Sequence, residues 1–128
     1  MVKYTLKNLT NLPDVASQSG LDDIQEARFA KDALEAKRTG LSYHRIKAGR
    51  RQPFAHRHNE AEEVYVVIAG SGRVKLDEDV VELHPLDALR VAPEVTRAFE
   101  AGAEGIELLA FGPRHDGDGE MLRDWWSD

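Results

Sequence analysis

Residues 49–70 read GRRQPFAHRHNEAEEVYVVIAG, and this stretch decides the fold and points to a site. His56 and His58 are two residues apart, so both side chains project from one face of an extended strand. Glu63 follows five residues after His58, which would place it on the opposite face of an unbroken strand. We therefore predict a turn or bulge at residues 59–61 that returns Glu63 to the face of the two histidines.

These three residues, named here the His-His-Glu triad, offer two imidazole nitrogens and one carboxylate. Proteins use this ligand set to bind iron, manganese, nickel or zinc ions while leaving other positions of the ion open. We therefore predict a divalent metal site at His56, His58 and Glu63. Two histidines at this spacing are commonly surface residues, but the glutamate and the β-rich run up to Gly70 strengthen the interpretation as a metal site. Tyr65 shares the strand face of Glu63.

Short strands with regular turns surround this stretch. Apolar and β-branched runs alternate with Gly, Pro and Asp turn signals roughly every 8–12 residues. This pattern predicts an all-β fold, an antiparallel sandwich or barrel. The expected strands are Leu41–Ile46, Val64–Ile68, Arg73–Leu76, Val80–Leu83, Ala88–Val91, Thr96–Glu100 and Ile106–Phe111.

Residues 24–38 are ambiguous between helix and strand. The alanines and Leu34 recur at helical spacing before Gly40, and intrinsic propensity favours a helix. Ala27 and Phe29, in contrast, alternate with charged residues as on a short strand. Both alternatives remain open on the residues alone.

The two ends of the chain differ from its centre. Residues 1–23 are polar and rich in turn formers, which predicts an N-terminal arm. Residues 113–128 predict a C-terminal tail that begins as a loop. Its adjacent Trp125 and Trp126 either cover one end of the barrel or contact a partner subunit.

Composition excludes several classes of function. The chain has 17 Lys and Arg against 23 Asp and Glu, a net charge of −6, and this acidic balance does not suit a nucleic-acid or anionic-membrane partner. The absence of Cys rules out disulfides, zinc–thiolate sites and a cysteine nucleophile. No apolar run approaches a membrane span, and the first residues lack the apolar core of a secretion signal, so we expect a cytoplasmic protein.

The opening stretch resembles the first motif of the cupin superfamily. That motif is Gly, five residues, His-x-His, three or four residues, Glu, six residues and Gly. Here the order is Gly49, six residues, His56-x-His58, four residues, Glu63, six residues and Gly70. Only the first gap differs, by one residue.

The resemblance extends over about residues 40–111 and implies a small jelly-roll β-barrel. The barrel is expected to span residues 24–112, with residues 25–31 as an added strand rather than a helix. More narrowly, the chain resembles small single-domain bacterial cupins of unassigned activity. The resemblance also implies a homodimer, for which the arm and the tryptophan tail offer contacts.

Arg97 is the main departure from the family pattern. The second cupin motif ends in a histidine that binds the metal, and Arg97 occupies that position. A guanidinium keeps its proton and has no lone pair to offer, so it cannot bind a metal ion. Arg97 would instead pair with Glu63 inside the barrel or bind an anion such as a carboxylate. Phe99, two residues further, is expected to face the cavity with it.

Three functions follow from the resemblance. The first is a small-molecule-binding cupin, with or without a divalent Zn, Ni, Mn or Fe ion, in which Arg97, Tyr65 and Phe99 contact the ligand. The second is a metalloenzyme of isomerase, dioxygenase or decarboxylase type that uses the His-His-Glu triad. The third is a structural barrel whose vestigial site is closed by an Arg97–Glu63 pair. The sequence does not decide whether the protein is an enzyme.

The remaining histidines and arginines carry weaker signals. His44 lies on the strand before the first motif, where it is either a substitute ligand or a hydrogen-bonded strand residue. His84 at a turn and His115 in the tail loop are expected at the surface. Arg50 and Arg51 are expected to be turn charges.

Overall fold

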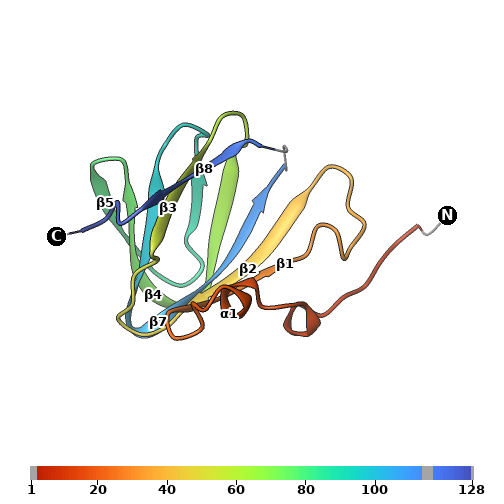
Figure 1. Ribbon diagram of the computed structural model, residues 1–128, viewed down its shortest axis with the longest axis horizontal. Coiled ribbons are helices and arrows are strands. Elements are labelled where there is room, and N and C mark those ends of the chain that lie inside the picture. Colours follow the sequence, from red (N-terminus) through yellow and green to blue (C-terminus); the bar gives the residue numbers. More distant parts are fainter. Residues whose placement is uncertain (1–2, 114–116, 128) are drawn as a thin grey trace.

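One curled antiparallel sheet forms the body of the protein, as the computed structural model shows for residues 3–113 and 117–127 (Figure 1). The expected all-β fold is therefore confirmed. The described elements are η1 (Leu9–Asn11), α1 (Val15–Gln18), β1 (Gln25–Phe29), β2 (Gly40–Ile46), β3 (Phe54–His58), β4 (Glu63–Leu76), β5 (Asp79–Leu83), β6 (Ala88–Val91), β7 (Arg97–Gly112) and β8 (Gly119–Arg123).

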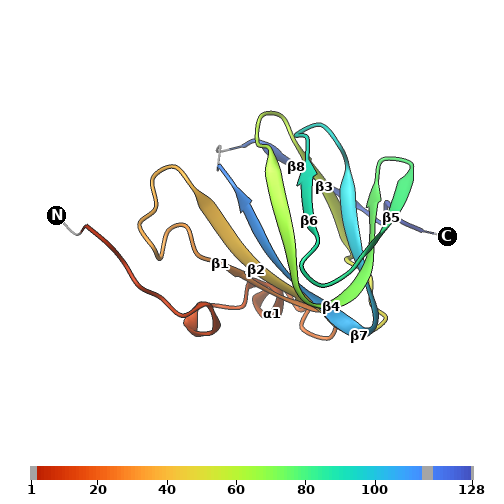
Figure 2. The ribbon, with the colours of Figure 1, turned by 180° about the vertical axis from the view of Figure 1, so that it is seen from behind.

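β4 and β7 are the two longest strands and form the centre of the barrel. Each of them spans two of the shorter strands that the sequence predicted. They pair with each other along most of their length (Figure 2). The predicted strands leave gaps at residues 69–72 and 101–105, where turns were expected. This expectation was wrong, because Gly70 and Gly105 adopt positive φ but remain within the paired strands β4 and β7. A Cβ on Gly70 would lie 2.1 Å from the Gly105 carbonyl oxygen, so glycine lets the bent strands approach closely instead of separating.

The ambiguous segment after residue 24 is a strand in its first part. β1 pairs antiparallel with β2, from Gln25 opposite Ile46 to Phe29 opposite Ser42. The ladder along β2 satisfies the backbone of this segment, which outweighs its helix propensity. Residues 31–39 form turns, so the helix alternative is wrong and the predicted strand is two residues too long.

The C-terminal tail contributes β8, a strand that the sequence did not predict. β8 lies beside β3 (Figure 1) and pairs antiparallel with it, with Met121 opposite His56. Beyond it, Trp126 packs against Ala55 and Ala98. The tail therefore covers the strand that carries the two histidines of the triad.

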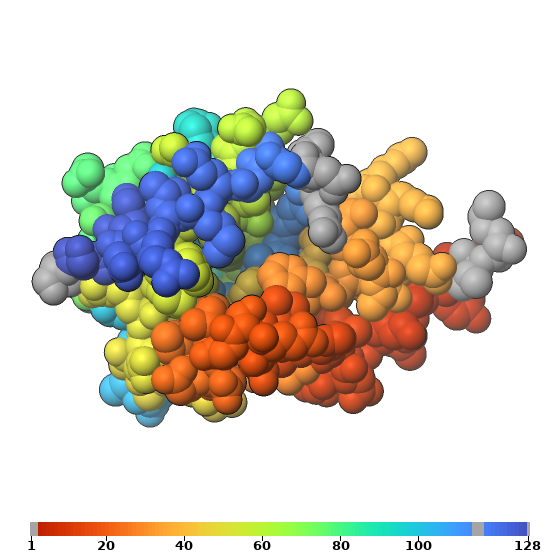
Figure 3. Space-filling view, viewed as in Figure 1, coloured from red at the N-terminus to blue at the C-terminus, as the bar shows by residue number. Residues whose placement is uncertain are grey.

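The barrel interior is filled by apolar side chains of β2, β4, β6 and β7, among them Ile46, Val67, Val74, Phe99 and Leu108. The N-terminal segment lies outside this core and crosses one side of the barrel, below the C-terminal segment in Figure 3. No helix in the described part of the chain is long and apolar enough to cross a membrane.

Candidate functional site

The His-His-Glu triad forms where β3 ends and β4 begins. His56 and His58 lie on β3, the chain bends at residues 59–60, and Glu63 opens β4. The Nε2 atoms of both histidines lie 3.2 Å from Oε1 of Glu63. The ligating atoms of all three residues lie within 4.8 Å of one another. The sequence-predicted bend therefore brings the three side chains together.

Asp118 fixes this bend and was missed by the sequence analysis. Its carboxylate accepts hydrogen bonds from the backbone N–H groups of Asn59, Glu60 and Ala61. Its Oδ2 also lies 3.2 Å from Nδ1 of His58. Although burial favours the neutral acid, these backbone hydrogen bonds lower the pKa of the Asp118 carboxyl, so it is an anion behind His58.

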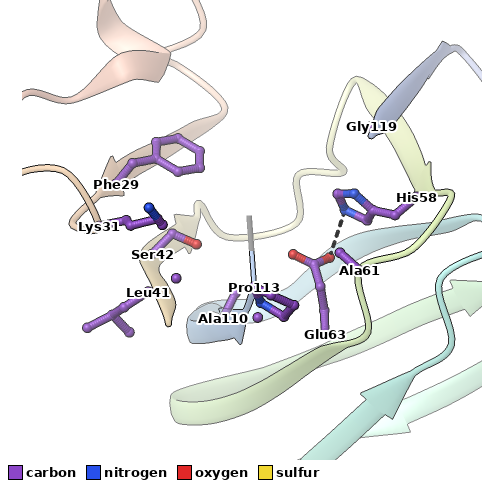
Figure 4. Close-up of a pocket in the computed structure, with 12 residues that line it drawn as sticks. Phe29, Lys31, Leu41, Ser42, His58, Ala61, Glu63, Ala110, Pro113 and Gly119 are labelled. Carbon is purple, nitrogen blue, oxygen red and sulfur yellow. Dashed lines mark ion pairs between the residues drawn. The ribbon is translucent and has the colours of Figure 1, made fainter. Parts of the chain in front are cut away.

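All the contacts that the structure describes for the Glu63 carboxylate fall on one of its two oxygens, Oε1. Oε1 accepts from the Tyr65 hydroxyl at 2.6 Å and from Nη2 of Arg97 at 3.0 Å, in addition to its contacts with the histidines. Burial raises the pKa of Glu63, but its contacts with His56, His58 and Tyr65 outweigh this effect and hold it well below the usual 4.5. The second oxygen points toward a cavity (Figure 4).

That cavity has a volume of about 490 Å³ and opens beside the triad. His58 and Glu63 line one wall, and the opposite wall is formed by residues of β1, β2 and the turn between them (Figure 4). The residues on this opposite wall include Phe29, Lys31, Leu41 and Ser42. The size is that of a pocket for a small organic molecule.

A family model for the cupin domain matches residues 42–111 of the sequence. The chain belongs to the cupin family. No curated protein sequence matches it.

Solved structures with the same fold include proteins of several chemistries. A cupin protein from Bacteroides fragilis is 23% identical, with a TM-score of 0.71 over 100% of this chain and 99% of that one. The polyketide cyclase RemF from Streptomyces resistomycificus is 17% identical, with a TM-score of 0.75 over 97% and 87%. A salicylate 1,2-dioxygenase from Pseudaminobacter salicylatoxidans is 17% identical, with a TM-score of 0.64 over 77% and 30%. At these identities the likeness concerns the fold.

Arg97 of this cupin lies directly across the ladder from His56 and has no exposed surface. Each guanidinium nitrogen donates to a protein oxygen. Nε reaches the Tyr65 hydroxyl at 3.3 Å, Nη1 reaches the Val95 carbonyl at 2.6 Å, and Nη2 reaches Glu63. The side chain therefore points at the triad, as expected, but its donors are directed to the protein rather than to the cavity.

Tyr65 and Phe99 lie behind the triad. Their rings contact each other edge to face, with centroids 4.9 Å apart, and both are buried in the core. Neither is among the residues that line the cavity. Burial raises the pKa of the Tyr65 hydroxyl, so it stays protonated and donates to Glu63. A direct contact of Tyr65 or Phe99 with a ligand stays a prediction.

His44 faces the interior from β2, but it is not one of the three clustered ligands. Its Nε2 lies 2.8 Å from the Ser42 hydroxyl, and its ring meets Phe29 edge to face. Burial, and then the nearby His56, lower the pKa of His44 from 6.5 to about 4. The ring is therefore neutral near pH 7, in agreement with the interpretation as a hydrogen-bonded strand residue.

The other singled-out side chains lie away from the triad. His84 is exposed, beside Asp87, and His115 lies outside the described residues. Arg50 is exposed as expected. The prediction of a turn charge was wrong for Arg51, because it binds Glu100 through two nitrogens and the Trp126 carbonyl through a third.

The donor set fits a divalent metal ion. Atoms that occupy neighbouring positions on one ion, each at about 2.0–2.2 Å, lie roughly 3 Å apart, and the His–Glu distances of 3.2 Å match this spacing. Both ring nitrogens of His58 are buried and make no aligned hydrogen bond within the described chain. The Arg97 guanidinium adds a fixed positive charge at the same carboxylate, which opposes a cation.

Proposed function

We propose that this cupin binds a small organic molecule in the cavity and that the His-His-Glu triad holds a divalent metal ion in its wall. The observation that carries the proposal is the convergence of two imidazole nitrogens and one carboxylate at the edge of the cavity. The second Glu63 oxygen points into the same space (Figure 4). A bound ligand would therefore lie against the triad.

Residues around the triad would prepare it for this role. The Asp118 carboxylate faces Nδ1 of His58, which favours a proton on that nitrogen and leaves the Nε2 lone pair for the metal. Tyr65 and Arg97 hold the Glu63 carboxylate from behind. When bound, the metal would polarise an oxygen of the ligand.

The reaction, if the protein has one, is not assigned by the fold. The structural neighbours include a dioxygenase and a polyketide cyclase, and one fold supports many chemistries. Metalloenzyme activity through the triad therefore stays an alternative within the same proposal.

A second candidate is a structural barrel without a metal. The 3.0 Å contact between Nη2 of Arg97 and Oε1 of Glu63 favours it, because a buried guanidinium compensates the carboxylate charge without an ion. In this case the triad would be a remnant of a metal site.

Metal titration separates the two candidates. We would purify the protein without a histidine tag or chelator, measure its metal content, and titrate it with Zn²⁺, Ni²⁺ and Mn²⁺ by calorimetry. The proposal expects one ion per chain and loss of binding in the double variant His56→Ala/His58→Ala. The control is His84→Ala, which removes an exposed histidine and should leave binding unchanged.

Two outcomes would argue against the proposal. A folded wild type that binds none of the three ions would favour the structural barrel. Stoichiometric metal in the double variant would place the ion at another site.

A further inference from the structure

Lys31 is a charge on the cavity wall opposite the triad, and no described acidic residue pairs with it. Of the cavity-lining residues that the structure describes, Lys31 and Glu63 are charged. Arg97 compensates Glu63, whereas Lys31 forms no ion pair with a described acidic residue. The lysine is half-buried beside Phe29 and Ser42 (Figure 4). A cation held in a partly apolar cavity favours an anionic partner.

Ser42 offers a hydroxyl next to this cation. Its side chain points into the cavity from β2 (Figure 4), and its Oγ lies 2.8 Å from Nε2 of His44. His44 is a neutral imidazole, so one of its nitrogens carries a proton. If Nε2 donates to the serine oxygen, the serine hydroxyl remains free to donate to a ligand.

The rest of this wall is apolar. The Phe29 ring lies beside Lys31 and Ser42, and Ala110 lies between the two walls (Figure 4). A ligand that reaches from Lys31 toward the triad would therefore lie along hydrocarbon and aromatic surface.

We propose that the ligand of this cavity is a small organic acid, with its carboxylate on Lys31 and Ser42 and its apolar body against Phe29 and Ala110. This inference rests on the proposed small-molecule function and names the ligand class of the same cavity. It places the anion site on β2 and the β1–β2 turn, not on Arg97, whose nitrogens already donate to protein oxygens.

The donors favour a carboxylate over a phosphate. One ammonium and one hydroxyl match the two oxygens and single charge of a carboxylate. A phosphate carries more charge and more acceptor oxygens than these two side chains satisfy. Phenyl phosphate is therefore expected to bind more weakly than benzoate.

The test compares acids with their neutral amides. We would titrate ¹⁵N-labelled protein with benzoate, hexanoate, benzamide, hexanamide and phenyl phosphate, and follow the backbone signals by NMR. The series would be run once with Zn²⁺ and once with a chelator. We expect both acids to bind at least about tenfold more tightly than their amides and to shift signals of β1, β2 and the turn between them.

Variants of the same turn locate the anion site. Lys31→Met should weaken benzoate binding at least about tenfold and leave benzamide unchanged, while Lys31→Arg should retain most of the affinity. Ser42→Ala should weaken benzoate binding by a smaller factor. Lys37→Met is the matched control, because Lys37 is exposed in the same turn region and does not line the cavity.

The outcomes separate this inference from the metal proposal. A Lys31 dependence that persists with chelator supports the anion site whether or not the triad binds metal. Equal affinity of acids and amides, no binding of either acid at millimolar concentration, or unchanged benzoate affinity in Lys31→Met would overturn the inference. Tighter binding of phenyl phosphate than of benzoate would overturn the choice of a carboxylate.

Discussion

Glu63 and Glu100 are two carboxylates of nearly equal side-chain exposure, 19% and 20%, and arginine contacts both of them. Arg51 donates from two nitrogens to one oxygen of Glu100, at 2.9 and 2.6 Å. Arg73 donates in the same way to the other oxygen, at 2.9 and 2.6 Å. Every contact described for Glu63, in contrast, falls on one oxygen, and its second oxygen points into the cavity (Figure 4).

The difference shows how similar residues serve different purposes. Both oxygens of Glu100 are occupied by guanidinium groups, and Arg51 continues to the Trp126 carbonyl and lies 4.2 Å from the centroid of the Trp126 ring. This cluster fastens the C-terminal segment to the barrel. Glu63 contacts one arginine and two imidazoles through a single oxygen. Its other oxygen faces the cavity, so the carboxylate retains the capacity to bind a further group (Figure 4).

The largest expected effect comes from removing each carboxylate. Glu63→Leu leaves Arg97 fully buried without an anionic partner, and we expect the free energy of unfolding to fall by about 3–5 kcal/mol. Glu100→Leu leaves Arg51 and Arg73, whose side chains are 24% and 44% exposed and able to reach water, so we expect a loss of about 1–2 kcal/mol. Urea unfolding of both variants measures the two losses.

A compensating variant tests the cause of the larger loss. Glu63→Leu/Arg97→Met removes both charges and should recover most of the stability that Glu63→Leu loses, because no unpaired ion remains in the interior. Equal losses in Glu63→Leu and Glu100→Leu, or no recovery in the double variant, would contradict the distinction between the two carboxylates.

The second effect concerns Asp118, which supports the Glu63 side only. Asp118→Asn keeps the shape of the side chain but removes the anion behind Nδ1 of His58, so the affinity for Zn²⁺ should fall about 10–100-fold. Asp77→Asn is the matched control, since Asp77 also accepts a backbone hydrogen bond, from Thr96, but has no contact with the triad. Equal Zn²⁺ affinity of both variants in calorimetry would remove Asp118 from the site.

These residues also show how much the sequence could predict. His56, His58 and Glu63 lie within eight residues of one another, so local spacing predicted their convergence. Asp118 approaches this bend from 57 to 59 residues further along the chain, and no local pattern reports such a contact. The same applies to β8, whose pairing with β3 depends on where the folded tail returns.

Arg97 and Phe99 show a second limit. Strand parity correctly placed both on the inner face of β7, but the inner face of a barrel includes the packed core as well as the cavity. Arg97 is turned to Glu63, while Phe99 is held in the core against Tyr65. Sequence periodicity identifies which residues share one face of a strand. Whether a residue on that face packs in the core or lines the cavity depends on the arrangement of the neighbouring strands.

The third effect sharpens the role of Arg97. Arg97→His removes the fixed cation beside Glu63 and adds an imidazole opposite His56, so we expect the affinity for Zn²⁺ and Mn²⁺ to rise at least about tenfold. Arg73→His makes the same exchange at Glu100 and should leave metal affinity unchanged. Calorimetry at fixed pH measures both, and equal affinities of wild type and Arg97→His would mean that Arg97 does not oppose the metal.

The last effect is a difference in pH dependence between the two sides of the barrel. The pKa of His44 is lowered from 6.5 to about 4 in the folded state, so the unfolded chain takes up this proton first as the pH falls. The stabilisation is present in full above pH 6.5 and is lost between pH 6.5 and 4. The lowered pKa values of Glu63 and Glu100 act in the same direction, but only as the pH falls below 4.5.

The interval from pH 6.5 to 4.5 therefore reports the cavity side and not the Glu100 cluster. Urea unfolding should show wild type losing stability over this interval, and His44→Gln should lose about 2 kcal/mol less, because Gln keeps a hydrogen bond to Ser42 but does not titrate. Glu100→Gln should match wild type there and differ only below pH 4.5. If His44→Gln and wild type had the same slope between pH 6.5 and 4.5, the imidazole beside Ser42 would not be held neutral by burial in the folded barrel.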